Sequence, residues 1–172
     1  MNLMKDGVNM LNEELATIKQ AIVNEVEGYE FYRMAADQAK SSGSKEAFLM
    51  LAEEELKHAE YLKLLFEKVK DGISDDIKLA FLSDPPSPNI YNWNKVDKDF
   101  LGLAMSVFGV GMQMERDAIA FYENARDNST LEEAQRLYNL LIGWEKLHLE
   151  QFSQQYQIYK TDWWLKQGFS PF

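Results

Sequence analysis

The chain has 172 residues, which is enough for one domain with a substantial buried core. It carries 18 basic and 28 acidic side chains, a formal charge of −10, so nucleic acid and anionic membrane surfaces are poor partners for it. It contains no cysteine, which excludes disulfides, thiolate metal sites and iron–sulfur centres within these residues.

The absence of cysteine fits a reducing cytoplasm. The first thirty residues lack a basic start followed by an apolar run, so we expect no signal peptide. No stretch of about eighteen apolar residues occurs, so we expect no membrane span. These features together predict a cytoplasmic protein.

Apolar residues at helical spacing predict four long helices. The first is expected from about residues 9–12 to residue 40 and the second from about 44 to 71, with the serine-rich break at 41–44 between them. The third is expected at about 97–127. A capping box at Ser129–Glu132 predicts the start of the fourth, because serine and glutamate at this spacing satisfy each other's backbone N–H groups.

The connection between the second and third helices is long. It spans about residues 73–96 and includes Asp84-Pro85-Pro86-Ser87-Pro88, which no helix tolerates in its interior. The short connections on either side force antiparallel neighbours, while the long one lets the chain cross from one end of the bundle to the other. The sequence therefore predicts an all-α, ferritin-like four-helix bundle, made of two antiparallel hairpins joined by one long crossover. Residues 1–172 form a single domain in this interpretation, with a short aromatic tail at about 161–172.

The only two histidines of the chain end the same local motif, Glu-x-x-His, and they lie 90 residues apart. A further glutamate precedes the glutamate of each motif by 30 residues, and a Phe-Tyr pair follows that upstream glutamate. The two copies supply three candidate metal ligands each: Glu25, Glu55 and His58 in the first, and Glu115, Glu145 and His148 in the second.

Residues three apart share a face of a helix, so each motif presents a carboxylate and an imidazole together. Four carboxylates and two imidazoles inside one bundle are the ligand set of a two-metal carboxylate site. Oxygen-rich coordination with two nitrogens suits iron or manganese better than tetrahedral zinc or all-oxygen calcium. We expect two iron ions, with manganese or mixed occupancy as the alternative. Glu55 and Glu145 are the expected bridging carboxylates and Glu25 and Glu115 the terminal ones, while each histidine binds one metal.

A structural interpretation competes with the metal interpretation. A lone Glu-x-x-His is common on exposed helices, and a lone inward histidine is usually a core residue with hydrogen-bond partners. Here both histidines occupy the same motif, and both motifs have a glutamate at the same upstream distance, which favours a metal site. Tyr32 and Tyr122 lie two turns past the upstream glutamates, and core packing accounts for their rings. Their hydroxyls are expected to support a ligand carboxylate across the bundle.

Gly28 and Ala118 each lie three residues past an upstream glutamate, where small side chains leave room for solvent or a small oxidant. The other acids near the motifs are expected to lie off the ligand face, in solvent or in surface ion pairs. These acids are Glu27, Glu53, Glu54, Glu60 and Glu150.

The motifs Glu25…Phe31-Tyr32, Glu53-Glu54-Glu55-Leu56-Lys57-His58, Glu115…Phe121-Tyr122 and Glu145-Lys146-Leu147-His148 resemble those of the rubrerythrin branch of the ferritin-like superfamily, over about residues 10–160. The resemblance implies a non-haem di-iron centre in a homodimer. It also implies reduction of hydrogen peroxide or dioxygen, with electrons from an external donor such as a rubredoxin. Relatives oxidise ferrous iron, so an iron-handling protein with ferroxidase activity, serving storage or sensing, is the alternative.

Two features depart from rubrerythrins proper. Those proteins carry a C-terminal rubredoxin domain, whereas this sequence has no cysteine and resembles the rubredoxin-less, erythrin-like form. They also carry an extra glutamate about three residues past the ligand of the third helix, where this chain has Ala118. The identity of the oxidant therefore stays open between peroxide and dioxygen.

Overall fold

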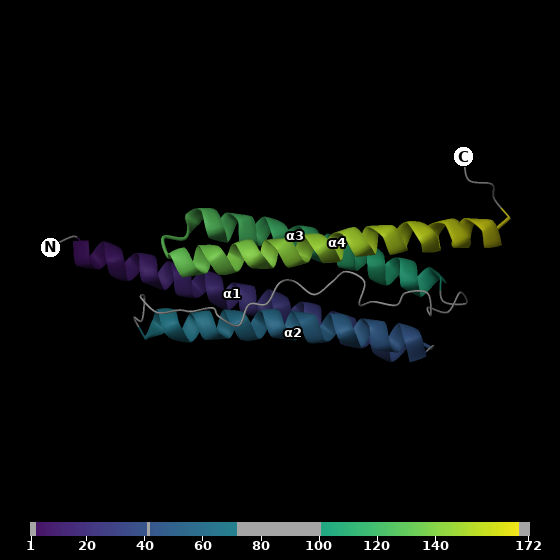
Figure 1. The fold of residues 1–172 in the computed structure, drawn as a ribbon, viewed down its shortest axis with the longest axis horizontal. Coiled ribbons are helices and arrows are strands. Elements are labelled where there is room, and N and C mark those ends of the chain that lie inside the picture. Colours follow the sequence, from purple (N-terminus) through teal and green to yellow (C-terminus); the bar gives the residue numbers. More distant parts are fainter. Residues whose placement is uncertain (1–2, 41, 72–100, 169–172) are drawn as a thin grey trace.

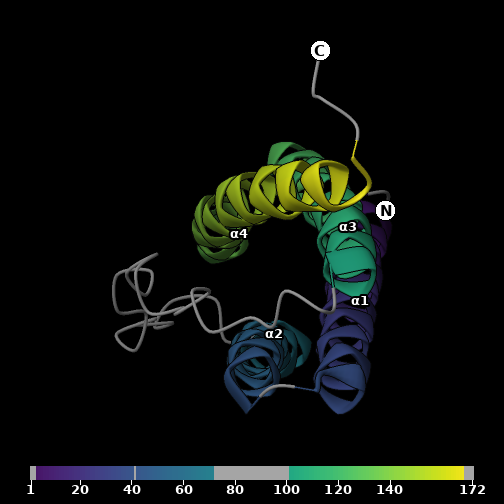
Figure 2. The same cartoon turned by 90° about the vertical axis from the view of Figure 1, so that its right-hand side faces the viewer.

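The computed structural model describes residues 3–40, 42–71 and 101–168, and the helices of this part are drawn in Figure 1. These helices are α1 (Leu3–Gln38), α2 (Ser42–Lys70), α3 (Leu101–Asn128) and α4 (Glu132–Lys166). α1 packs along α2 and α3 packs along α4, so the helices form two hairpins. The end-on view in Figure 2 shows the α3–α4 pair above the α1–α2 pair, with α1 next to α3.

This arrangement confirms the predicted all-α four-helix bundle of paired hairpins. The long crossover expected at 73–96 lies outside the described residues. The α1–α3 and α2–α4 contacts join the hairpins, and both are sparse compared with the contacts within each hairpin. Wider spacing between the hairpins leaves room for long polar side chains in the middle of the bundle.

The start of α4 differs from the prediction. The residue before the helix is Leu131, which has an extended backbone and makes no side-chain cap, so the capping box expected at Ser129 is wrong. The Ser129 hydroxyl instead donates to Glu14 of α1 at 2.6 Å, and it accepts from the Leu131 N–H at 3.2 Å. Tyr138 donates to the other oxygen of Glu14 at 2.8 Å. The buried Glu14 carboxylate of the first hairpin therefore accepts hydrogen bonds from two donors of the second hairpin, Ser129 and Tyr138.

The end of α4 also differs from the prediction. The helix continues without interruption to Lys166, so residues 161–166 belong to α4 rather than to a separate tail. Neither glycine nor proline occurs within this stretch to stop the helix. The next glycine, Gly168, adopts a φ of 75°, which is the left-handed backbone typical of a helix end.

The apolar core consists of two clusters, one towards each end of the bundle. In the first, the ring of Phe108 contacts those of Phe48 and Phe152, with centroids 5.9 and 5.7 Å apart. The second is dominated by aliphatic side chains: Ile18, Leu62, Leu65, Leu137, Leu141 and Ile142. Tyr32 belongs to the first cluster and Tyr122 to the second. The middle of the bundle, between the clusters, is where the polar candidate ligands lie.

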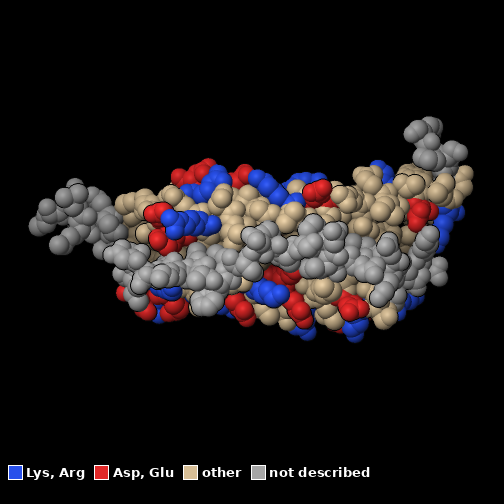
Figure 3. Space-filling view, in the orientation of Figure 1, with Lys and Arg blue, Asp and Glu red and all other residues tan. Residues whose placement is uncertain are grey.

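The surface of the helices is mixed in charge. Figure 3 shows basic and acidic side chains interspersed on one face of the molecule. Lys146 of α4 and Glu123 of α3 form an ion pair at 3.2 Å, and both side chains are exposed. No helix within the described residues combines the length and apolar character that crossing a bilayer requires.

Adjacent leucines of α2 test the assignment of the core. Leu65 is 0% exposed in the second cluster, while Leu64 is 52% exposed. Leu65→Ala is expected to lower the free energy of unfolding by about 2–5 kcal/mol, because it removes buried apolar surface and leaves a cavity. Leu64→Ala is expected to change it by about 0.5 kcal/mol or less. Urea unfolding of both variants checks this, and equal losses would contradict the assigned helix face.

Candidate metal centre

The six candidate ligands lie together in the middle of the bundle, and each is 4% exposed or less. All four helices contribute to the group, since α1 carries Glu25 and α3 carries Glu115. α2 and α4 contribute one Glu-x-x-His motif each, namely Glu55 with His58 and Glu145 with His148. The structure therefore brings together every ligand that the repeated motif predicts, although residues of the two copies lie about 90 positions apart in sequence.

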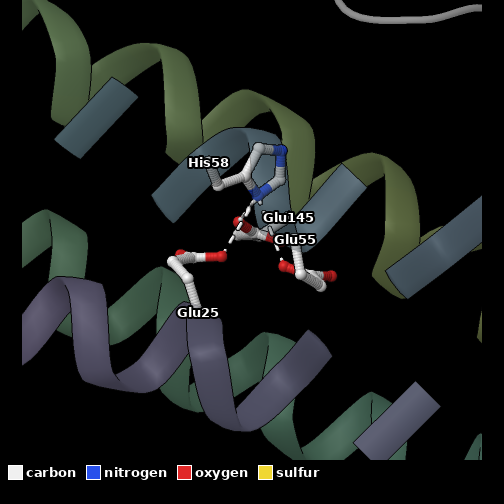
Figure 4. A group of neighbouring side chains, drawn as sticks. All are labelled: Glu25, Glu55, His58 and Glu145. Carbon is white, nitrogen blue, oxygen red and sulfur yellow. Dashed lines mark hydrogen bonds and ion pairs between the residues drawn. The ribbon is translucent and has the colours of Figure 1, made fainter. Parts of the chain in front are cut away.

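The first half of the cluster surrounds His58. Its Nδ1 atom lies 3.2 Å from Glu25 Oε2, 3.3 Å from Glu55 Oε2 and 3.1 Å from Glu145 Oε1. Figure 4 shows the three carboxylates converging on this nitrogen, with Glu25 reaching it from α1. Ligand atoms of the four residues all lie within 4.8 Å of one another, which is close enough for a single cation to contact them all.

The second half surrounds His148 in the same way. Its Nδ1 atom lies 3.5 Å from Glu55 Oε1, 3.2 Å from Glu145 Oε2 and 3.8 Å from Glu115 Oε2. Glu55 and Glu145 thus belong to both halves, and each turns one oxygen towards each histidine. A carboxylate shared in this way has the position that a bridge between two cations requires.

Several of these atoms are buried without a hydrogen-bond partner in the described part of the chain. They are Glu55 Oε1, both carboxylate oxygens of Glu145, and Nδ1 of His148. Buried polar atoms in native proteins are normally satisfied, so these atoms indicate a missing positive partner. Two divalent cations would satisfy them and would balance the charge of the four carboxylates. The donor set therefore fits a two-metal centre.

The electrostatics of the cluster lead to the same inference. Burial, reinforced by the nearby Glu145 carboxylate, raises the pKa of Glu115 to about 7 and also raises the pKa of Glu55. Burial alone would lower the pKa of His58, but the Glu145 carboxylate raises it well above its usual value. Burial would likewise raise the pKa of Glu145, but His58 and His148 hold it well below its usual range. Without cations, the cluster therefore retains protons near neutral pH.

Two tyrosines reach across the bundle to the terminal glutamates. Tyr32 of α1 donates to Glu115 Oε1 at 2.7 Å, and Tyr122 of α3 donates to Glu25. Burial, together with the adjacent carboxylates, raises the pKa of both phenols, so both keep their protons as donors. Gly111 makes room for the first contact, because a Cβ atom there would lie 3.3 Å from the Tyr32 hydroxyl. Each tyrosine therefore fixes one oxygen of a candidate ligand.

The expectation that Glu54 lies in solvent is wrong. It is 6% exposed, and its Oε2 atom lies 3.1 Å from Nε2 of His148, the ring nitrogen that faces away from the cluster. Its position four residues before His58 and three after Leu51 follows the inner stripe of α2, which is a signal the sequence already contains. The remaining acids of that group are exposed, as expected: Glu27, Glu53, Glu60 and Glu150.

A cavity of about 420 Å³ reaches the cluster from between α1 and α3. Gly28 and Ala118 line it, together with Glu25, Glu55 and Glu115. A Cβ atom at position 28 would lie 3.3 Å from Glu55 Cγ, so glycine there lets the shared carboxylate approach α1. The two small residues thus keep an open path beside the candidate ligands.

A family model described as Rubrerythrin matches residues 17–156, a span that runs from α1 into α4 and includes all six candidate ligands. No curated protein and no solved structure matches the chain.

Metal affinity is expected to rise between pH 6 and pH 8. Cations compete with protons on Glu115, whose pKa is about 7, and on both histidines, whose pKa values are raised. Calorimetric titration with Mn²⁺ in buffers of different ionisation enthalpy measures the affinity and the protons released. Glu53→Gln, which removes an exposed charge beside the cluster, is the control and should show the same pH dependence. Binding of Mn²⁺ without proton release at pH 7 would contradict this account.

Proposed function

The chain belongs to the rubrerythrin family, a ferritin-like di-iron carboxylate family, and on that premise we propose that it is an oxidoreductase. Its buried cluster binds two iron ions and reduces hydrogen peroxide or dioxygen with electrons from an external donor. The observation that supports this best is the sharing of Glu55 and Glu145 between two overlapping four-residue groups.

The contacts support a role for each ligand. Glu55 and Glu145 would hold both ions, because each directs one oxygen to each half of the cluster. His58 and His148 would each hold one ion through Nδ1. The terminal ligands are Glu25 and Glu115, each with one oxygen held by a tyrosine. Manganese or a mixed pair fits the same donors, because Mn²⁺ and Fe²⁺ favour similar oxygen and nitrogen ligands.

A reduced iron pair supplies two electrons, the number consumed by cleavage of one O–O bond in peroxide. Peroxide takes up these electrons with two protons and leaves as two water molecules. The protein's part is to keep the terminal carboxylates in place through Tyr32 and Tyr122 and to leave an approach path past Gly28 and Ala118. Aromatic and aliphatic clusters on both sides limit the access of bulk water.

Repeated turnover needs electrons from outside this sequence. It contains no cysteine and so offers no thiolate-bound iron to relay them. A one-electron donor protein such as a rubredoxin, acting twice per peroxide, would restore the reduced pair.

A ferroxidase role in iron storage or sensing is the second candidate. Glu27 and Asp117 line the cavity and are exposed, so the path to the cluster is acidic and suits an entering ferrous ion. In this role Fe²⁺ is the electron source, and dioxygen is the oxidant.

Stopped-flow mixing of the iron-loaded, reduced protein with peroxide, and separately with dioxygen, tests the proposal. We expect peroxide to oxidise two irons per chain in one phase and turnover then to stop until a rubredoxin and its reductase are added. Continued dioxygen consumption with excess Fe²⁺ would favour the ferroxidase role instead. Failure of both oxidants to react with the fully loaded protein would contradict both roles.

Two alanines of α3 provide a matched test of the path. Ala118→Leu places a larger side chain in the cavity, whereas Ala120→Leu makes the same change at an exposed position. We expect the first variant to retain two irons but to react with peroxide about tenfold more slowly, equivalent to roughly 1.4 kcal/mol of barrier. The second variant should react at the original rate. Equal rates in both iron-loaded variants would show that the oxidant enters elsewhere.

A further inference from the structure

The two halves of the cluster are related by the sequence repeat, yet their surroundings differ. The residue before each shared glutamate is Glu54 in the first motif and Trp144 in the second. Both are buried, and each contacts the histidine of the other motif. The same repeat position therefore supports the two candidate metal positions with different chemistry.

At His148 the support is a carboxylate. Glu54 Oε2 lies 3.1 Å from Nε2, on the opposite side of the ring from the Nδ1 atom that faces Glu145. A carboxylate in this position accepts the Nε2 proton, so the lone pair of the imidazole is left on Nδ1. It also adds negative charge behind the ring and makes Nδ1 a better donor to a cation.

At His58 the support is an aromatic plane. The indole of Trp144 stacks on the imidazole, with ring centroids 4.8 Å apart and an interplanar angle of 10°. The ring of Tyr61 also contacts this indole, at 5.8 Å between centroids. Within the described residues, the polar contacts of His58 are made by Nδ1 alone. Stacking orients the imidazole ring. Unlike a carboxylate, however, an indole does not accept a hydrogen bond from Nε2–H and adds no negative charge.

We propose that Glu54 makes the two metal positions unequal, so that the position formed by Glu55, Glu115, Glu145 and His148 binds its cation first and more tightly. The proposal rests on the proposed two-metal function and adds an order to it. Glu54 acts here as a positioning residue, through His148, and Trp144 marks the weaker position at His58. Loss of a carboxylate that supports a metal-binding histidine typically lowers metal affinity by about 10- to 100-fold.

The chain offers a direct readout, because it contains only two histidines. Labelling with ¹⁵N-histidine and titrating the full chain with Zn²⁺, a diamagnetic probe, follows Nδ1 of each ring separately. A His58→Gln variant assigns the two sets of signals. With one equivalent of Zn²⁺, we expect the Nδ1 signal of His148 to shift to its metal-bound value while His58 stays free, and with two equivalents we expect both to shift.

Substitutions at position 54 test the cause. Glu54→Ala removes the acceptor and is expected to lower the affinity for the first Zn²⁺ by about 10- to 100-fold. Both histidine rings should then bind Zn²⁺ over the same range of added metal. Glu54→Gln keeps an acceptor oxygen without the charge, so its affinity for the first Zn²⁺ should lie between those of the unaltered protein and Glu54→Ala. This variant also keeps the test valid if Glu54→Ala folds poorly. Glu53→Ala and Glu53→Gln make the same changes at the exposed neighbour and should leave the order unchanged.

Each outcome separates this inference from the function on which it rests. Two bound Zn²⁺ ions that fill both positions together in the unaltered protein, or His58 first, would overturn the proposed order. An unchanged order in folded Glu54→Gln and Glu54→Ala would overturn the role of Glu54. Absence of Zn²⁺ at both histidines would instead contradict the two-metal site itself.

Discussion

The burial of four carboxylates and two imidazoles between two helical hairpins is the constraint on which the rest of this structure depends. Charges in a bundle core carry a large desolvation cost, and like charges in contact add to it. Protons on Glu115 and Glu55, whose pKa values are raised, and protonated histidines offset part of that cost in the metal-free chain. Divalent cations would offset it more completely, because they would also balance the charge of the buried Glu145 oxygens, which have no hydrogen-bond partner in the described part of the chain.

The surrounding fold reflects this constraint. The apolar residues form two clusters rather than one, and the polar group lies between them. Tyr32 and Tyr122 each belong to one cluster and donate into the polar group, so packing at each end of the bundle also fixes a terminal carboxylate. Gly28 of α1 also affects a candidate ligand, since a side chain there would crowd the shared carboxylate of Glu55. Packing therefore determines ligand geometry, and the bundle can hold the metal ligands rigidly. A cavity between α1 and α3 still leaves a path to these ligands.

Local and periodic features of the sequence predict much of this arrangement. The apolar period predicts the helices, and the repeated Glu-x-x-His motif identifies six side chains that the structure brings within reach of one another. The contacts that sequence reasoning missed depend on how helices meet. Glu54 lies at the border of the inner stripe of α2, and only the approach of α4 decides that it contacts His148. Ser129 has the spacing of a helix cap, but Glu14, from the far end of the sequence, offers its hydroxyl a buried carboxylate instead.

Crystals of iron-reconstituted protein, measured at the iron absorption edge, show directly whether two cations share the cluster. We expect two anomalous peaks per chain, both in contact with Glu55 and Glu145, with Nδ1 of His58 on one and Nδ1 of His148 on the other. Metal analysis of the same sample should give two irons per chain. A single peak at full reconstitution, or peaks away from this cluster, would contradict a shared two-metal centre.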